Sequence, residues 1–118
     1  MRTSLGIILL IWAVIVMARA ESSTINGYLV DKQCSKGLAT QGKKAVAEHD
    51  RTCILMDVCV QSGFGVLTED GTFIEFDEAG SKKAAEALES SAKEKDFKVT
   101  VTGDRRGDRI KVESLKLQ

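Results

Sequence analysis

Two segments of the chain, residues 64–77 (FGVLTEDGTFIEFD) and residues 97–117 (FKVTVTGDRRGDRIKVESLKL), decide the fold. Each holds two runs of apolar and β-branched residues separated by a polar turn that contains glycine, which is the pattern of a β-hairpin. In the first segment, Asp70-Gly71 predicts a type I′ turn, which needs positive φ at both central residues. In the second, the alternation slips at Glu113-Ser114 and predicts a β-bulge. The two segments therefore predict four strands.

A fifth strand and two helices complete the predicted pattern. Residues 24–31 are rich in β-branched and aromatic side chains and predict the first strand. Residues 35–42 contain glycine and serine and predict a loop, whereas residues 43–61 hold no helix breaker and predict one continuous helix. Residues 82–95 predict a second helix with Ser81 as its N-cap.

The order of these elements is strand, helical insert, hairpin, helix, hairpin. This order predicts a fold that is mainly β with α (α+β): a five-stranded OB-like Greek-key barrel, with a helical insert after strand 1 and a helix between strands 3 and 4. Closure of the barrel would remove the strand edges that five short strands otherwise expose. The alternative is an open α+β meander with both helices on one face.

Residues 1–20 predict a signal peptide that is cleaved. Arg2 is followed by the apolar run of residues 5–17, and Ala18-Arg19-Ala20 is the small-x-small pattern of a cleavage site. A helix of this run spans roughly 20 Å, short of the ~30 Å hydrocarbon core of a bilayer. An uncleaved anchor or a buried helix is the alternative. We expect a periplasmic or secreted protein whose mature chain, residues 21–118, is a single OB-like domain with no membrane span.

The composition excludes several classes of protein. The chain is 43% hydrophobic and 29% charged, which is typical of globular domains and not of disordered ones. It carries 17 basic and 17 acidic residues, and two of the basic ones lie in the predicted signal peptide. A mildly acidic mature chain with few aromatic residues gives no strong nucleic-acid signal. The sequence leaves the ligand and the partners unknown.

The residues that could carry chemistry are Cys34, His49, Cys53 and Cys59, in the order C-x14-H-x3-C-x5-C. On one continuous helix, His49 and Cys53 would be four residues apart and share a face. Cys59 would then lie about 120° around the helix from Cys53 and ~9 Å along its axis. A disulfide between Cys53 and Cys59 would therefore require the helix to break.

Three interpretations of this cluster stay open. The first is a structural disulfide from Cys34 to Cys53 or Cys59, which would stabilise a small exported domain by roughly 3 kcal/mol. The second is a site for zinc or monovalent copper, with Cys34, His49, Cys53 and Cys59 as four ligands. The third is a redox-active thiol or an intermolecular disulfide made by the odd cysteine. No C-x-x-C motif supports the work of an oxidoreductase.

No catalytic constellation emerges from the sequence. With one histidine, a Cys–His nucleophile pair would need Asp31 or Asp50 to orient the imidazole, and placement four residues apart on a helix is poor geometry for it. We therefore expect no enzymatic activity and predict an exported binding module, with capture of a soft metal (zinc or copper) as its most specific form. The alternative is a structural or envelope-interaction protein with a disulfide-stapled barrel.

Several motifs together resemble a group of small exported bacterial proteins of unknown function with OB-like domains. These are Gly27-Tyr28-Leu29-Val30-Asp31-x-x-Cys34, His49-x3-Cys53-x5-Cys59-x3-Gly63, and the late strands Val99-Thr100-Val101-Thr102-Gly103 and Ile110-Lys111-Val112-Glu113-Ser114. The resemblance covers nearly all of the predicted mature chain. It implies an exported OB-like domain in which the cysteine-bearing helical insert is a feature of the group. It does not distinguish a metal site from a disulfide.

Overall fold

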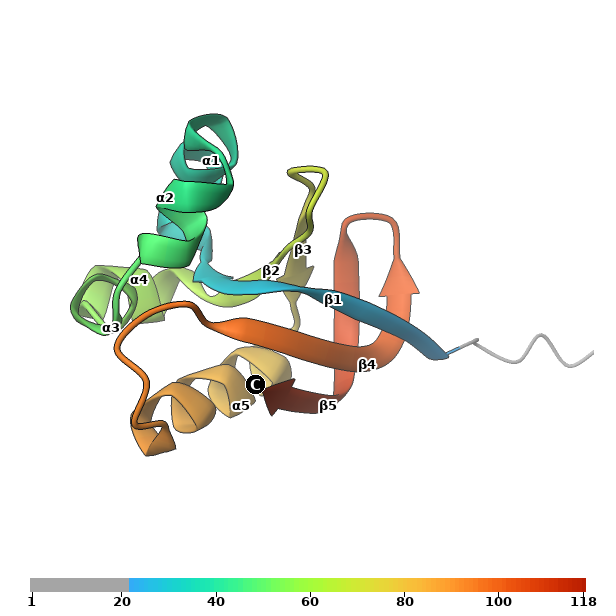
Figure 1. Ribbon diagram of the computed structural model, residues 1–118. Helices are drawn as coiled ribbons and strands as arrows, with labels where there is room; N and C mark the ends of the chain where they lie inside the picture. The colour runs from blue at the N-terminus through green and yellow to red at the C-terminus, as the bar shows by residue number, and fades with distance from the viewer. Residues whose placement is uncertain (1–21) are drawn as a thin grey trace, which may run out of the picture.

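A computed structural model describes residues 22–118 of the chain (Figure 1). Its elements are β1 (Ser22–Asp31), α1 (Lys32–Gln41), α2 (Lys43–Glu48), α3 (Arg51–Ile54), α4 (Asp57–Ser62), β2 (Phe64–Leu67), β3 (Phe73–Phe76), α5 (Glu78–Ser90), β4 (Lys98–Arg106) and β5 (Arg109–Leu117). The strands close into a barrel in the order β1-β2-β3-β5-β4, which confirms a five-stranded barrel combined with helices. The predicted signal peptide, residues 1–20, lies outside the described residues. Within the described part of the chain, no helix is long and apolar enough to cross a membrane.

Strand β1 pairs with two neighbouring strands along different parts of its length. It pairs antiparallel with β4 through residues 22–28 and with β2 through residues 28–31. The barrel closes on its other side where β3 pairs in parallel with β5. Helices α1 to α4 gather at the end of the barrel where β1 runs into α1, and α5 packs beneath the strands (Figure 1). The C-terminal end of β1 therefore lies against the helical segment.

The predicted bulge in the last hairpin is confirmed. Ser114 pairs with Thr102 and Val112 pairs with Gly103, so Glu113 has no partner in the ladder between β4 and β5. An extra residue on one strand shifts the alternation of the side chains by one position, which is the slip seen in the sequence.

The turn between β2 and β3 is not the predicted type I′ turn. Among the non-glycine residues described, only Asp96 has positive φ, so Asp70 does not adopt it, whereas Gly71 has a φ of 84°. The Gly71 N–H donates to the Thr68 carbonyl at 3.0 Å. A four-residue turn that ends in one left-handed glycine needs positive φ at only one position, so the type I′ prediction is wrong although the hairpin itself forms.

The predicted loop over residues 35–42 is wrong, because α1 occupies residues 32–41. The helix starts at Lys32, since the Asp31 carboxylate accepts a hydrogen bond from the Cys34 N–H at 3.0 Å and acts as the N-cap. The helix after β3 also begins earlier than predicted. Asp77, and not Ser81, is its N-cap through the Gly80 N–H at 3.1 Å.

The predicted continuous helix over residues 43–61 is also wrong, because three short helices replace it. The backbone is extended at His49 (ψ 109°) and at Met56 (ψ 142°), and these residues separate α2, α3 and α4. Asp50 starts α3 by accepting a hydrogen bond from the Cys53 N–H at 2.9 Å. His49 and Cys53 therefore do not share the face of one helix.

Arg51, just after the first of these breaks, makes long-range hydrogen bonds. The Arg51 guanidinium donates to the carbonyl oxygens of Ser91, at 2.7 Å, and Glu89, at 3.0 Å, both at the C-terminal end of α5. The Arg51 backbone N–H donates to the carbonyl of Glu94 at 2.8 Å. The carbonyls of Glu89 and Ser91 lie at the end of α5, where backbone oxygens lack helical partners and attract a cation, so Arg51 ties the start of α3 to this end of α5.

The core has two parts. The larger fills the barrel with side chains from the strands and from α5: Ile25, Leu29, Ile54, Phe64, Val66, Ile74, Phe76, Ala84, Leu88, Phe97, Val99, Val101, Ile110 and Val112. The smaller joins α1 and α2 to the barrel through Val30, Leu38, Val46 and Leu67. Asp31 follows Val30 at the end of β1 and is fully buried, so a carboxylate lies at the junction of the barrel and the helical segment.

Candidate metal centre

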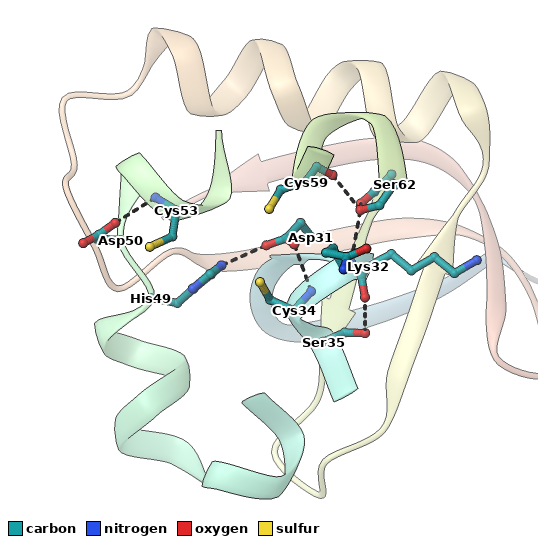
Figure 2. Close-up of polar contacts among 11 residues, drawn as sticks. Asp31, Lys32, Cys34, Ser35, His49, Asp50, Cys53, Cys59 and Ser62 are labelled. Atoms are coloured by element: carbon teal, nitrogen blue, oxygen red, sulfur yellow. Dashed lines mark hydrogen bonds and ion pairs between the residues drawn. The ribbon is translucent and has the colours of Figure 1, made fainter. Parts of the chain in front are cut away.

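Asp31 is the centre of the cysteine and histidine cluster. Figure 2 shows its side chain between those of Cys34, Cys59 and His49. The ligand atoms of Asp31, Cys34 and Cys59 all lie within 4.8 Å of one another. The residues come from three elements: the end of β1, the first turn of α1 and α4. Two thiols and a carboxylate that converge in this way are a donor set for a divalent metal ion.

His49 contacts the cluster through Asp31. Its Nε2 lies 2.8 Å from Asp31 Oδ1, and the exposed fractions of the two side chains are 8% and 0%. His49 is the C-cap of α2, where the chain turns before α3, and this turn directs its ring toward Asp31. Because an ionised carboxylate can only accept, the Nε2 of His49 carries the hydrogen in this bond.

The buried Asp31 carboxyl stays ionised because it has several donors. Burial raises its pKa, but hydrogen bonds from His49, from the backbone N–H of Cys34 and from the thiols of Cys59 and Cys34 outweigh burial. The pKa of Asp31 therefore lies below its ordinary value. The cluster thus holds a negative charge on a buried carboxylate.

Both thiols beside this carboxylate are held in the protonated form. Burial, together with the hydrogen bond to Asp31 and its charge, raises the pKa of the Cys59 thiol to about 12. Burial and the charge of Asp31 also raise the pKa of Cys34. Cys59 is 3% exposed and Cys34 is half-buried. A metal ion would have to displace both protons, since the thiolate is the form that binds metal.

Cys53 lies at the edge of the cluster. It is exposed on α3, and its sulfur is not among the atoms that lie within 4.8 Å of one another. A hydrogen bond from its thiol to Asp50 raises its pKa. Of the four residues singled out from the sequence, the structure brings Cys34 and Cys59 together and joins His49 to them through Asp31. It leaves Cys53 outside this group.

Sequence reasoning did not place Asp31 in the candidate metal centre. The sequence suggested it only as an acid that could orient a histidine. A stronger signal was present: an aspartate between a strand and a helix, three residues before Cys34, is an N-cap pattern. An N-cap at this position turns the first residues of the helix around the carboxylate, and that brings the Cys34 side chain to Asp31.

A groove of about 590 Å³ lies elsewhere, between α1 and α2 on one side and the turn that joins β2 and β3 on the other. Tyr28, Leu38 and Val46 are among its lining residues, which include none of the cysteines. An exposed ion pair, Lys43 Nζ to Glu69 Oε1 at 2.6 Å, links its two sides. The groove and the cysteine cluster are therefore separate features.

Comparison of the chain with protein-family models, with curated proteins and with solved structures found no match.

Proposed function

We propose that the protein is an exported metal-binding module that holds one zinc ion through Asp31, Cys34 and Cys59, with His49 keeping Asp31 in place. The observation that carries the proposal is the group of three ligand atoms within 4.8 Å of one another. Thiolate, imidazole and carboxylate are the ligands that Zn²⁺ takes in proteins. Zinc fits this set better than monovalent copper, because copper(I) selects soft sulfur ligands and a carboxylate oxygen is hard.

The charges of the cluster favour a divalent cation. Asp31 supplies one negative charge that is buried and ionised in the absence of metal. When zinc binds, the thiol protons of Cys34 and Cys59 leave to solvent, and the two thiolates with Asp31 give three negative charges around Zn²⁺. The carboxylate attracts the cation, and the cation in turn lowers the energy of both thiolates.

Three protein ligands leave one position of a tetrahedral zinc ion for a further ligand. Structural zinc sites usually fill all four positions with protein side chains, whereas sites with three protein ligands admit water or an exogenous group. Neither His49 nor Cys53 belongs to the group of three. We therefore assign the module to capture and exchange of zinc, and not to a closed structural site.

The fold and the location form part of the same proposal. We assign the barrel to the OB-like Greek-key type on the strand order β1-β2-β3-β5-β4, with α5 between β3 and β4 and the helical insert between β1 and β2. The N-terminal apolar run and its small-x-small motif support export to the periplasm or the medium.

Zinc binding by the reduced protein tests the proposal. Native mass spectrometry and competition with a chromophoric chelator should find one zinc ion per chain. Cys34→Ser and Asp31→Asn should lose it, and Cys53→Ser should keep it, as the matched control with the same chemical change at an exposed thiol. Reduced wild-type protein that takes no zinc would overturn the proposal, as would a Cys34→Ser variant that binds like the wild type.

A second candidate is a structural or envelope-interaction protein, for which the cluster would serve only as a staple. The groove of about 590 Å³ favours this candidate, because its size is that of known ligand sites and it lies away from the cysteines. The same zinc titration separates the candidates, since a staple predicts a Cys34–Cys59 disulfide and no metal under any redox condition.

A further inference from the structure

We propose that zinc and a disulfide compete for the same two sulfur atoms, so that oxidation of Cys34 and Cys59 to a reversible disulfide expels the metal. This inference rests on the proposed function, because it makes the metal-bound dithiol and the metal-free disulfide the two states of one site. The two sulfurs lie within 4.8 Å of each other, and both cysteines are free.

The bridge would join two helices that already lie against each other. Cys34 lies in the first turn of α1 and Cys59 lies in α4, and these two helices contact each other. Side-chain rotation has to shorten the distance between the sulfurs to the ~2.05 Å of a disulfide. Cys53, on the exposed helix α3, is not in the group, so the structure selects Cys59 as the partner of Cys34.

The Asp31 carboxylate keeps hydrogen-bond donors when the two thiols are oxidised to a disulfide. Loss of the two thiol donors still leaves the carboxylate with His49 Nε2 at 2.8 Å and with the Cys34 N–H at 3.0 Å. A buried charge without partners would make the oxidised state costly, and these two donors avoid that cost. The His49–Asp31 pair therefore stabilises the site in both redox states.

The reaction needs an oxidant, and a low-molecular-weight disulfide is the class that fits. The Cys34 sulfur, the more accessible of the two, attacks the external disulfide and forms a mixed disulfide, which releases one thiolate. The Cys59 sulfur then attacks the Cys34 sulfur and releases the second thiolate. The protein dithiol loses two electrons and the external disulfide gains them. In the zinc-loaded protein, both sulfur–zinc bonds break and Zn²⁺ leaves; in the metal-free protein, the two thiol protons pass to the released thiolates.

Oxidised glutathione added to the zinc-loaded protein tests this competition. A chromogenic chelator should record one zinc ion released for each intramolecular disulfide formed, and peptide mapping should find Cys34 joined to Cys59, with Cys53 in neither bridge partner's place. Reduction should restore zinc binding in full. The Cys53→Ser variant should behave as the wild type. The Cys34→Ser variant, which lacks the half-buried thiol, should form no Cys34–Cys59 bridge. Circular dichroism confirms that the variants are folded.

Three other outcomes would contradict the proposed competition between zinc and the disulfide. Zinc that stays bound to a protein with a mapped Cys34–Cys59 disulfide would show that the two states do not compete. An intramolecular disulfide between Cys53 and Cys34 or Cys59 would show that the wrong pair had been assigned. If the reduced protein binds no zinc, the proposed function fails. Mapping of the oxidised metal-free protein then still decides whether Cys34 and Cys59 form the reversible pair.

Discussion

His49 Nε2 lies 2.8 Å from Asp31 Oδ1, and this bond joins a strand end to a helix end 18 residues further along the chain. Asp31 also caps α1 through the Cys34 N–H and interacts with the thiols of Cys34 and Cys59. One buried carboxylate therefore holds together the barrel, the first helix and the candidate metal centre.

Asp31→Asn should lower the free energy of unfolding by about 1.5–3 kcal/mol at pH 7, the range of hydrogen bonds to charged groups. Asparagine is as good an N-cap as aspartate, so α1 keeps its cap and the loss reflects the charge. Urea unfolding of the metal-free proteins measures the difference. Equal stability of the two proteins at pH 7 would contradict the central role of the ionised carboxylate.

The contribution of Asp31 to stability should disappear in acid. Its pKa in the folded protein lies below the ordinary value, so the stabilisation is present above the unfolded pKa of about 3.9 and is lost as pH falls through the lower folded pKa. The wild type and Asp31→Asn should therefore converge in unfolding free energy in strong acid, once the pH lies below the lowered folded pKa of Asp31. A gap that persists unchanged in this range would show that the charge is not its source.

His49→Gln should weaken zinc binding about 10- to 100-fold, the usual cost of removing a residue that orients a metal ligand. His49 acts through Asp31 as a positioning residue, so the stoichiometry of one zinc ion should persist. Chelator competition measures the affinity and native mass spectrometry the stoichiometry. Complete loss of zinc would instead make His49 itself a ligand that the site cannot replace.

Zinc affinity should rise about 100-fold for each pH unit between pH 6 and 8, because binding releases two thiol protons. Both pKa values lie above the ordinary value, with that of Cys59 at about 12, so both thiols are protonated over this whole range. Chelator competition at several pH values gives the slope. A slope near zero would mean that thiolates do not bind the metal.

The three thiols should react with iodoacetamide in the order Cys53, Cys34, Cys59 in the metal-free reduced protein. Cys53 is exposed, Cys34 is half-buried and Cys59 is buried, and the raised pKa of Cys59 leaves it almost no reactive thiolate at pH 8. A time course followed by peptide mass spectrometry gives the three rates. Zinc should protect Cys34 and Cys59 further and leave the rate of Cys53 unchanged.

Much of the barrel follows from the sequence, because alternation along a strand is a local property. The hairpin over residues 64–77 was predictable from two apolar runs around a glycine-containing turn, and the bulge at Glu113 from side-chain period. The helix boundaries were not, since Asp31, Asp50 and Asp77 cap helices that composition alone does not delimit. The start of α3 is also tied to α5 by Arg51, whose partners lie 38 to 42 residues away.

Part of the candidate metal centre was also predictable from the sequence, and part was not. Residue type alone singles out Cys34, His49, Cys53 and Cys59, because thiols and imidazoles are the common metal ligands. Their convergence depends on the chain turning at His49 and on Asp31 lying at the end of β1. Exposure separates Cys53 from the group, and exposure is a property of the folded chain that spacing does not reveal.

X-ray absorption at the zinc edge of the loaded, reduced protein tests the central claim most directly, because it counts the atoms bound to the metal. The proposed site predicts two sulfur atoms at about 2.3 Å, from Cys34 and Cys59, and two lighter atoms at about 2.0–2.2 Å, one of them from Asp31. Three sulfur atoms would place Cys53 on the metal. A zinc ion bound only by oxygen and nitrogen would contradict the claim altogether.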